Sequence, residues 1–263
     1  MSLSLVPILL TKRKAPNFKK ISGMKLKEVY KSSPFGVVSS FLIGISHSAV
    51  FSLIAVYATS MNFSILEVSI VTFLFAISGA ISQWPIGKLS DVLDRRIVII
   101  YTTFGAALFC FLAIISSGQM YMPAGLATSK IFFYICIMCF SFCSLPMFAL
   151  IFAHTNDFIP KEKFVAAGAG LQFVFGLGAI CGPFMCSLFM EFLGENGFFI
   201  FLIIFHSFIG LFGIYRMQIR ESGDNPDSQF APMPQTITPA GIELNPSTEP
   251  IDEPNNLNEF KKI

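Results

Sequence analysis

Residues 83–96, which read QWPIGKLSDVLDRR, form a short charged segment between two long apolar runs. Neither the run before it, 68–87, nor the run after it, 97–129, contains Asp, Glu, Lys or Arg. A helix needs about 20 apolar residues to cross a hydrocarbon core of about 30 Å, and lipid offers no hydrogen-bond partner to an open backbone group. The sequence therefore predicts two membrane-spanning helices joined by a turn at the water interface.

Other parts of the chain show the same pattern of long segments without charged residues. Four further windows lack Asp, Glu, Lys and Arg and are long enough to span, namely 32–66, 131–156, 164–190 and 196–215. Pro, Gly and polar clusters trim the helices that they predict. We expect an all-α integral membrane protein with six transmembrane helices, near 34–59, 65–87, 96–116, 130–154, 164–190 and 197–216.

The composition excludes most other classes of protein. Apolar residues make up 54% of the chain and charged residues 13%, and 31 residues are Phe. This balance excludes a soluble enzyme, a nucleic-acid binder and a disulfide-stapled secreted domain. All six cysteines lie in apolar runs, where a thiol stays protonated, so we predict no metal site and no cofactor. The spans hold no paired nucleophile and base, and we do not expect an enzyme.

The basic residues predict an orientation, because Lys and Arg near span ends are retained on the cytoplasmic side. Six spans place both termini on one face, and seventeen of the eighteen basic residues fall there; Lys130 alone is opposite. We therefore predict a multi-pass membrane protein with both termini in the cytoplasm.

The chain divides into three parts by composition. Residues 1–31 combine a short apolar stretch with a basic cluster, in the wrong order for a signal peptide, and are typical of the end of a preceding helix followed by a basic cytoplasmic loop. Residues 32–220 hold the six spans. Residues 221–263 are acidic and rich in Pro, and we expect a disordered cytoplasmic tail.

The charged segment resembles the short cytoplasmic signature of the major facilitator superfamily (MFS). The resemblance is carried by Gly87, Leu89, Asp91, Arg95 and Arg96. Val92 and Asp94 depart from it, standing where the signature often has a basic residue and a Gly. The alternative interpretation is an ordinary charged turn that obeys the topology.

A second resemblance lies in the fifth span. Gly178, Gly182 and Pro183 resemble the glycine-proline helix signature of the same superfamily, and small residues let membrane helices pack backbone to backbone. Any tight helix contact would also explain them. Together with 33-SPFG-36 and 154-HTND-157, they make the chain most similar to the YcaD-like group of bacterial facilitators. This resemblance implies that the chain lies in the bacterial inner membrane.

The resemblance implies a fold and a function. Members of the superfamily have twelve helices in two six-helix halves, so this chain is expected to form the C-terminal half. The implied function is secondary active transport of an unidentified small solute by alternating access. The implied partners are the lipid bilayer, the solute, and an N-terminal six-helix half or a second copy, with no nucleic acid. The alternative is a non-transporting truncated or accessory membrane protein.

Few polar residues lie within the spans, and they are the candidates for a solute cavity. They are His47, Gln83, Asn156 and Gln172. The resemblance places the first and fourth spans against the central cavity, which favours His47 there over a histidine that only joins two helices. His206 is read as structural, and Asp157 is read either as a site residue or as a helix cap.

Overall fold

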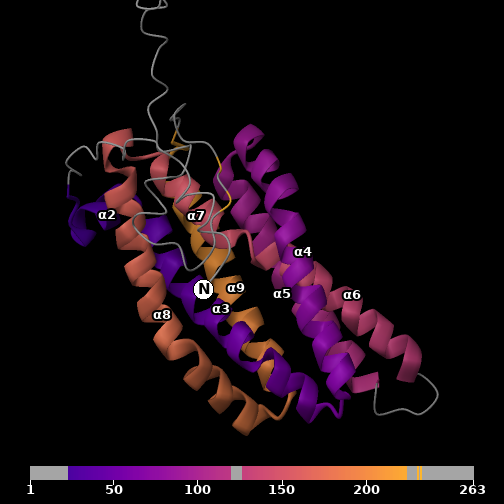
Figure 1. The fold of residues 1–263 in the computed structure, drawn as a ribbon. Coiled ribbons are helices and arrows are strands. Elements are labelled where there is room, and N and C mark those ends of the chain that lie inside the picture. The colour runs from indigo at the N-terminus through magenta and orange to yellow at the C-terminus, as the bar shows by residue number, and fades with distance from the viewer. Residues whose placement is uncertain (1–22, 120–125, 224–229, 231, 233–263) are drawn as a thin grey trace, which may run out of the picture.

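A computed structural model of the chain describes residues 23–119, 126–223, 230 and 232. Within these residues the structure consists of helices, with no strand (Figure 1). The expected basic segment therefore lies largely outside the described residues, as does most of the expected tail. In chain order the helices are α2 (Leu26–Ser32), α3 (Pro34–Ser60), α4 (Ile65–Val92), α5 (Arg95–Gln119), α6 (Leu126–Ser144), α7 (Met147–Asn156), the 3₁₀ turn η3 (Lys161–Lys163), α8 (Phe164–Leu193) and α9 (Asn196–Ile219).

Six helical segments in the described part of the chain are long and apolar enough to cross a membrane, which confirms the predicted fold class. α3, α4, α5, α8 and α9 each form one span. The fourth span, Lys130–Asn156, is divided between α6 and α7.

Two boundaries differ from the sequence prediction. α4 continues five residues past Gly87 to Val92 and α5 begins at Arg95, so the turn within the charged segment is only Leu93 and Asp94. A helix can continue beyond its apolar run because water at the interface solvates its charged side chains. The fourth span breaks at Leu145 and Pro146, because Pro has no N–H to continue the helix ladder.

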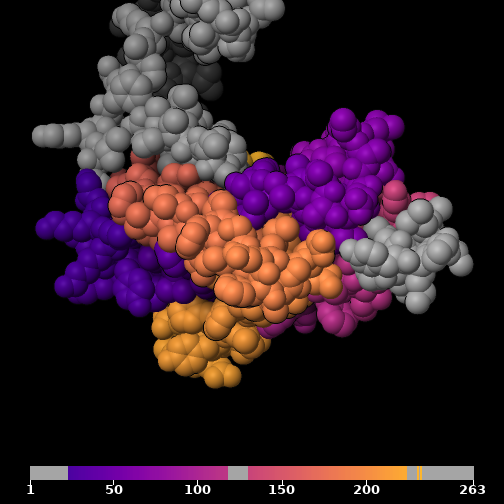
Figure 2. Space-filling view, turned by 90° about the horizontal axis from the view of Figure 1, so that it is seen from below, coloured from indigo at the N-terminus to yellow at the C-terminus, as the bar shows by residue number. Residues whose placement is uncertain are grey.

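α3 is the central helix of the bundle. It packs along α8 on one side and also contacts α9, α4 and α7 (Figure 1). Its apolar window is 61% buried, whereas those of α4 and α8 are 28% buried each. Figure 2 shows the bundle from below, with the outer side of α8 uncovered in that view.

Aromatic side chains hold together the end of the bundle that lies away from the charged turn. Tyr57 of α3 stacks on Phe133 of α6 and Phe198 of α9, with ring centroids 6.0 and 5.2 Å away. Phe199 meets the same ring edge to face at 4.9 Å. Offset and edge-to-face pairs of this kind stabilise a packed core beyond the area that they bury. They join three helices that are far apart in the sequence.

Candidate functional site

Arg95, in the first turn of α5, joins three helices at the charged turn. Arg95 as a whole is 8% exposed. Nη2 donates to Oδ1 of Asp91, on α4, at 2.9 Å. Nη1 donates to the carbonyl of Ala153 on α7 at 3.3 Å and to the carboxylate of Asp157, which directly follows α7. A planar guanidinium with five donors suits such divergent contacts. Arg95 therefore ties the ends of α4 and α7 to the start of α5.

Arg96 makes a separate set of contacts with Asp94 and Arg220. Its Nη2 donates to the Asp94 carboxylate at 2.6 Å, and its Nη1 donates to the carbonyl of Arg220 at 2.6 Å. Partial burial acts to raise the pKa of Asp94, but the hydrogen bonds from Arg96 outweigh it and lower that pKa. Arg96 thus fixes the turn to the segment that follows α9.

Asp94, which departs from the family signature, has a local structural role. Its Oδ1 accepts the backbone N–H of Arg96 at 2.9 Å. This is the geometry of a helix N-cap, and Asp is among the best capping residues. A Gly at this position would have no side chain for the cap. Asp94, at a position where the signature often has Gly, is therefore compatible with the tight turn between α4 and α5.

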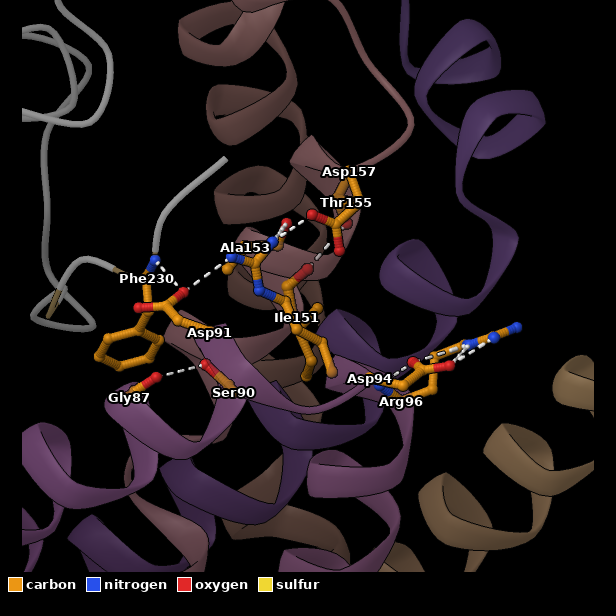
Figure 3. A network of polar contacts seen from close by, with 11 residues as sticks. Gly87, Ser90, Asp91, Asp94, Arg96, Ile151, Ala153, Thr155, Asp157 and Phe230 are labelled. Atoms are coloured by element: carbon orange, nitrogen blue, oxygen red, sulfur yellow. Dashed lines mark hydrogen bonds and ion pairs between the residues drawn. The ribbon is translucent and has the colours of Figure 1, made fainter. Parts of the chain in front are cut away.

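Asp91 also accepts a hydrogen bond from the tail. The backbone N–H of Phe230 donates to Asp91 Oδ1 at 2.9 Å, as Figure 3 shows. The Phe230 ring lies against Gly87 and occupies the space that a Cβ atom there would need. Gly87 is one of the residues that carry the resemblance to the family signature, whereas Phe230 was not among the candidates from the sequence. Its only signal in the sequence is an aromatic residue within an acidic, Pro-rich segment.

Leu89 is the outward-facing member of the signature. Its side chain belongs to the exposed large hydrophobic residues, at 48% exposure. The structure thus joins Asp91 and Arg95 directly, places Gly87 beside Asp91 through Phe230, and keeps Arg96 in its own pair with Asp94. The five residues of the signature therefore do not form one cluster.

His47 is buried in the middle of the bundle, at 1% exposure, and takes part in a chain of hydrogen bonds. Its Nε2 lies 3.1 Å from the carbonyl of Ser144 and 3.2 Å from the Ser144 hydroxyl, at the break between α6 and α7. That hydroxyl lies 2.8 Å from Nε2 of His206 on α9. The His206 Nδ1 lies 2.9 Å from the carbonyl of Leu202.

The backbone carbonyls assign a direction to this chain, because a carbonyl can only accept. Nδ1 of His206 must carry the proton that bonds to Leu202, so in the neutral ring Nε2 accepts from Ser144. Nε2 of His47 donates toward Ser144 for the same reason. His206, read as structural from the sequence, thus belongs to the same network as the candidate His47.

The other candidate cavity residues are spread over three helices. Gln83 lies on α4, and its buried Oε1 has no partner among the described residues. Asn156, at the end of α7, is 2% exposed. Gln172 is half-buried on α8. Their shared role in a cavity with His47 stays a prediction.

The glycines of the fifth span lie against the backbone of α3. A Cβ atom at Gly178 would meet the carbonyl oxygen of Phe41, and one at Gly182 would meet that of Ile45. Pro183 is half-buried within α8. This close approach of α8 to α3 requires side chains no larger than hydrogen at both positions.

A bundle of apolar helices with a charged turn of this kind defines a multi-pass membrane protein. Residues 36–250 match the sequence profile described as Major Facilitator Superfamily. The chain belongs to this superfamily.

The curated relatives are transporters without an assigned solute. An uncharacterized MFS-type transporter of Yersinia enterocolitica is 23% identical over 201 residues, covering 76% of this chain and 47% of the relative. Another, of Bacillus subtilis, is 26% identical over 191 residues, covering 70% of this chain and 45% of the relative. The chain thus spans about half the length of the curated relatives that it matches. No solved structure matches it significantly.

Proposed function

We propose that the chain forms one six-helix bundle of a secondary transporter that moves a small solute by alternating access, as the C-terminal half of an MFS permease of the YcaD-like group. The observation that carries the proposal is the exposure of α4 and α8, each only 28% buried over its apolar window. In a fold where two bundles rock about a central site, each bundle needs a face for the other.

The share of each relative that the chain matches supports this reading. About half of each relative is covered, which is the share expected for one bundle of two. The second bundle is an N-terminal six-helix half or a second copy of the chain. In either case the solute site lies between bundles. Of the four candidates, Gln83 and Gln172 are half-buried on α4 and α8 and face this site most directly, whereas His47 and Asn156 are buried inside the bundle and would reach the solute only after a rearrangement.

The charged turn serves in this proposal as a conformational switch. Asp91 shares its Oδ1 between Arg95 and Phe230, and its side chain is 37% exposed. The exposed part of the carboxylate is available to a helix N-terminus of the other bundle, where an anion is stabilised. Making and breaking that contact would favour one of the two access states.

The test is solute-dependent charge movement in proteoliposomes that contain the chain with and without a co-expressed six-span N-terminal half. A panel of small solutes serves as the probe. We expect saturable signals with both halves and none from the chain alone. Asp91→Asn should reduce the signal more than Asp94→Asn, because Asn at position 94 still caps α5. Equal activity of Asp91→Asn and wild type would contradict the switch.

The proposed orientation has its own test. In a background without the six native cysteines, Glu191→Cys should react with an impermeant maleimide added outside cells, and Lys88→Cys should react only after permeabilisation. Both side chains belong to exposed residues at opposite ends of the spans. Labelling of Lys88→Cys from outside would reverse the predicted topology.

A further inference from the structure

A half-open pocket lies where α3 begins, α5 begins and α9 ends. It has an empty volume of about 250 Å³, part of which is continuous with the surface. Three guanidinium groups line it, those of Arg96, Arg216 and Arg220. They come from separate elements, since Arg96 lies in the first turn of α5, Arg216 in the last turn of α9 and Arg220 directly after α9. The convergence of three cations on one pocket sets this region apart from the turn around Asp91.

The three arginines differ in the contacts that their side chains make. Arg96 is paired with Asp94. Arg220 lies over the Phe158 ring, 4.1 Å from its centroid, and donates to the carbonyl of Ser32 at 2.5 Å. The Arg216 side chain has no ion pair or hydrogen bond within the part of the chain that the structure describes. One pre-positioned cation and one free cation therefore face the pocket.

The charges around the pocket leave one positive charge uncompensated. The three guanidinium groups face two carboxylates, that of Asp94, paired with Arg96, and that of Glu221, which also lines the pocket. The pocket also borders Ser33 and Pro34 at the N-terminus of α3, a helix of 27 residues whose dipole adds to the positive potential. A ligand with one negative charge would balance the site.

The surface beside the pocket is apolar. Leu211, Tyr215 and Ile219 on α9 are exposed large hydrophobic residues, at 54 to 56%. They lie within about one and a half turns of Arg216 along the helix, on a segment long and apolar enough to span the membrane. A ligand held by Arg216 and Arg220 would therefore carry its apolar part along α9.

We propose that this pocket binds the phosphodiester of an anionic lipid, with Arg216 and Arg220 as its ligands and the acyl chains along the exposed stripe of α9. The single negative charge of a phosphatidylglycerol matches the uncompensated charge, and arginine contacts phosphate oxygens with two parallel N–H donors. The pocket lies at the predicted cytoplasmic face, where basic groups between membrane helices bind lipid headgroups. The inference does not depend on transport.

The experiment is native mass spectrometry of the full chain titrated with phosphatidylglycerol and, separately, with phosphatidylcholine. We expect one phosphatidylglycerol to bind more tightly than phosphatidylcholine. Arg216→Gln should weaken that binding about fivefold, the loss expected from one cation near an anionic headgroup. Arg216→Gln/Arg220→Gln should remove the preference, and Arg216→Lys should retain most of it.

Lys88→Gln is the matched control, because it removes one exposed cation from the same face outside the pocket. It should change phosphatidylglycerol binding less than twofold. An equal loss in Lys88→Gln and Arg216→Gln would overturn the site in favour of unspecific attraction, as would the absence of any lipid preference in the wild type.

A second arm separates a lipid headgroup from a free phosphate. Glycerol 3-phosphate at millimolar concentration should not raise the thermal stability of the detergent-purified chain, whereas phosphatidylglycerol should, and only with Arg216 intact. Stabilisation by glycerol 3-phosphate that is lost in Arg216→Gln, with no lipid preference, would overturn the lipid and assign the pocket to a soluble phosphate.

Discussion

At the scale of single residues, the charged turn separates into a buried pair and a more exposed one. Arg95 and Asp157 have side chains that are 9% exposed, whereas the side chain of Asp91 is 37% exposed. Taking one partner from a buried ion pair leaves a charge without compensation and costs about 3–5 kcal/mol. An exposed pair in water contributes about 0–1 kcal/mol. The stability of the turn should therefore depend on Asp157 more than on Asp91.

We predict that Asp157→Asn lowers the free energy of unfolding by about 3 kcal/mol, and that Asp91→Asn lowers it by less than half as much. Equilibrium unfolding in mixed micelles measures both. Arg95→Met combined with Asp157→Leu should cost less than the sum of the single changes, because the pair is then removed together. Equal losses in Asp157→Asn and Asp91→Asn would show that burial does not determine how much each carboxylate contributes to the free energy of unfolding.

The histidine network leads to a second prediction at this scale. Ser144→Ala removes the donor to His206 Nε2 in a fully buried site, which should cost about 1–2 kcal/mol of unfolding free energy. Ser46→Ala should cost less, because its hydroxyl lies 3.2 Å from His206 Nδ1 and that atom keeps its bond to the Leu202 carbonyl. ¹⁵N NMR of labelled histidine should show His206 as the Nδ1–H tautomer in the wild type. An Nε2–H tautomer there would reverse the direction of the network.

At the scale of helices, glycines of α8 let its backbone approach that of α3 closely. Gly178 is buried against Phe41, whereas a Cβ atom at Gly176 would meet nothing within 4 Å. The two glycines are two residues apart on one helix, so they differ in environment and share helix propensity. They form a matched pair for measuring the contact.

We predict that Gly178→Ala destabilises the bundle by about 1–3 kcal/mol, the usual cost of overpacking, while Gly176→Ala is neutral or slightly stabilising because Ala favours helix. Unfolding in mixed micelles compares them directly. A loss of similar size in both variants would mean that glycine acts through the flexibility of α8 and not through its contact with α3.

The sequence predicted the six spans because charge is excluded from lipid, and the pattern of charged residues is fully visible in one dimension. Pro146 could have indicated the break between α6 and α7, but a Pro within an apolar run is also compatible with a continuous, kinked helix. The C-terminal ends of α4 and α9 were harder to predict from the sequence. Interface residues such as Lys88 and Arg216 are compatible with both helix and loop.

The side-chain contacts depended on distant partners and were harder to predict. Lys130, the one basic residue on the opposite face, is neutralised by Glu67 at 2.6 Å, a partner 63 residues away. Asp157 was read as a possible helix cap, and its contact with Arg95 needs the fold to bring α5 beside α7. Phe230 had no periodic pattern around it at all. Local rules predicted the helices, while these pairs follow from the packing of the helices.

At the scale of the whole molecule, the outer side of α8 exposes large apolar side chains. Ile180 and Phe184 on α8 are 76% and 67% exposed, and Cys181 between them is also exposed. Lipid tolerates such side chains without cost, so exposure alone does not show whether lipid or protein covers this face. Because Cys181 is a native cysteine on this face, crosslinking through it can identify what lies beside α8.

We predict that a membrane-permeable bismaleimide links most copies of the isolated chain into dimers through Cys181, because two uncovered α8 faces are self-complementary under a twofold axis. Cys181→Ser should abolish the product, since Cys181 is the one exposed cysteine; Cys139 and Cys143 are half-buried on α6, away from the α8 face, and the other three are buried. Co-expression with a six-span N-terminal half should suppress the dimer and shield Cys181, because that half covers the same face. A dimer of unchanged yield in the presence of the second half would place α8 on the lipid side of the transporter and would move the bundle interface to another pair of helices.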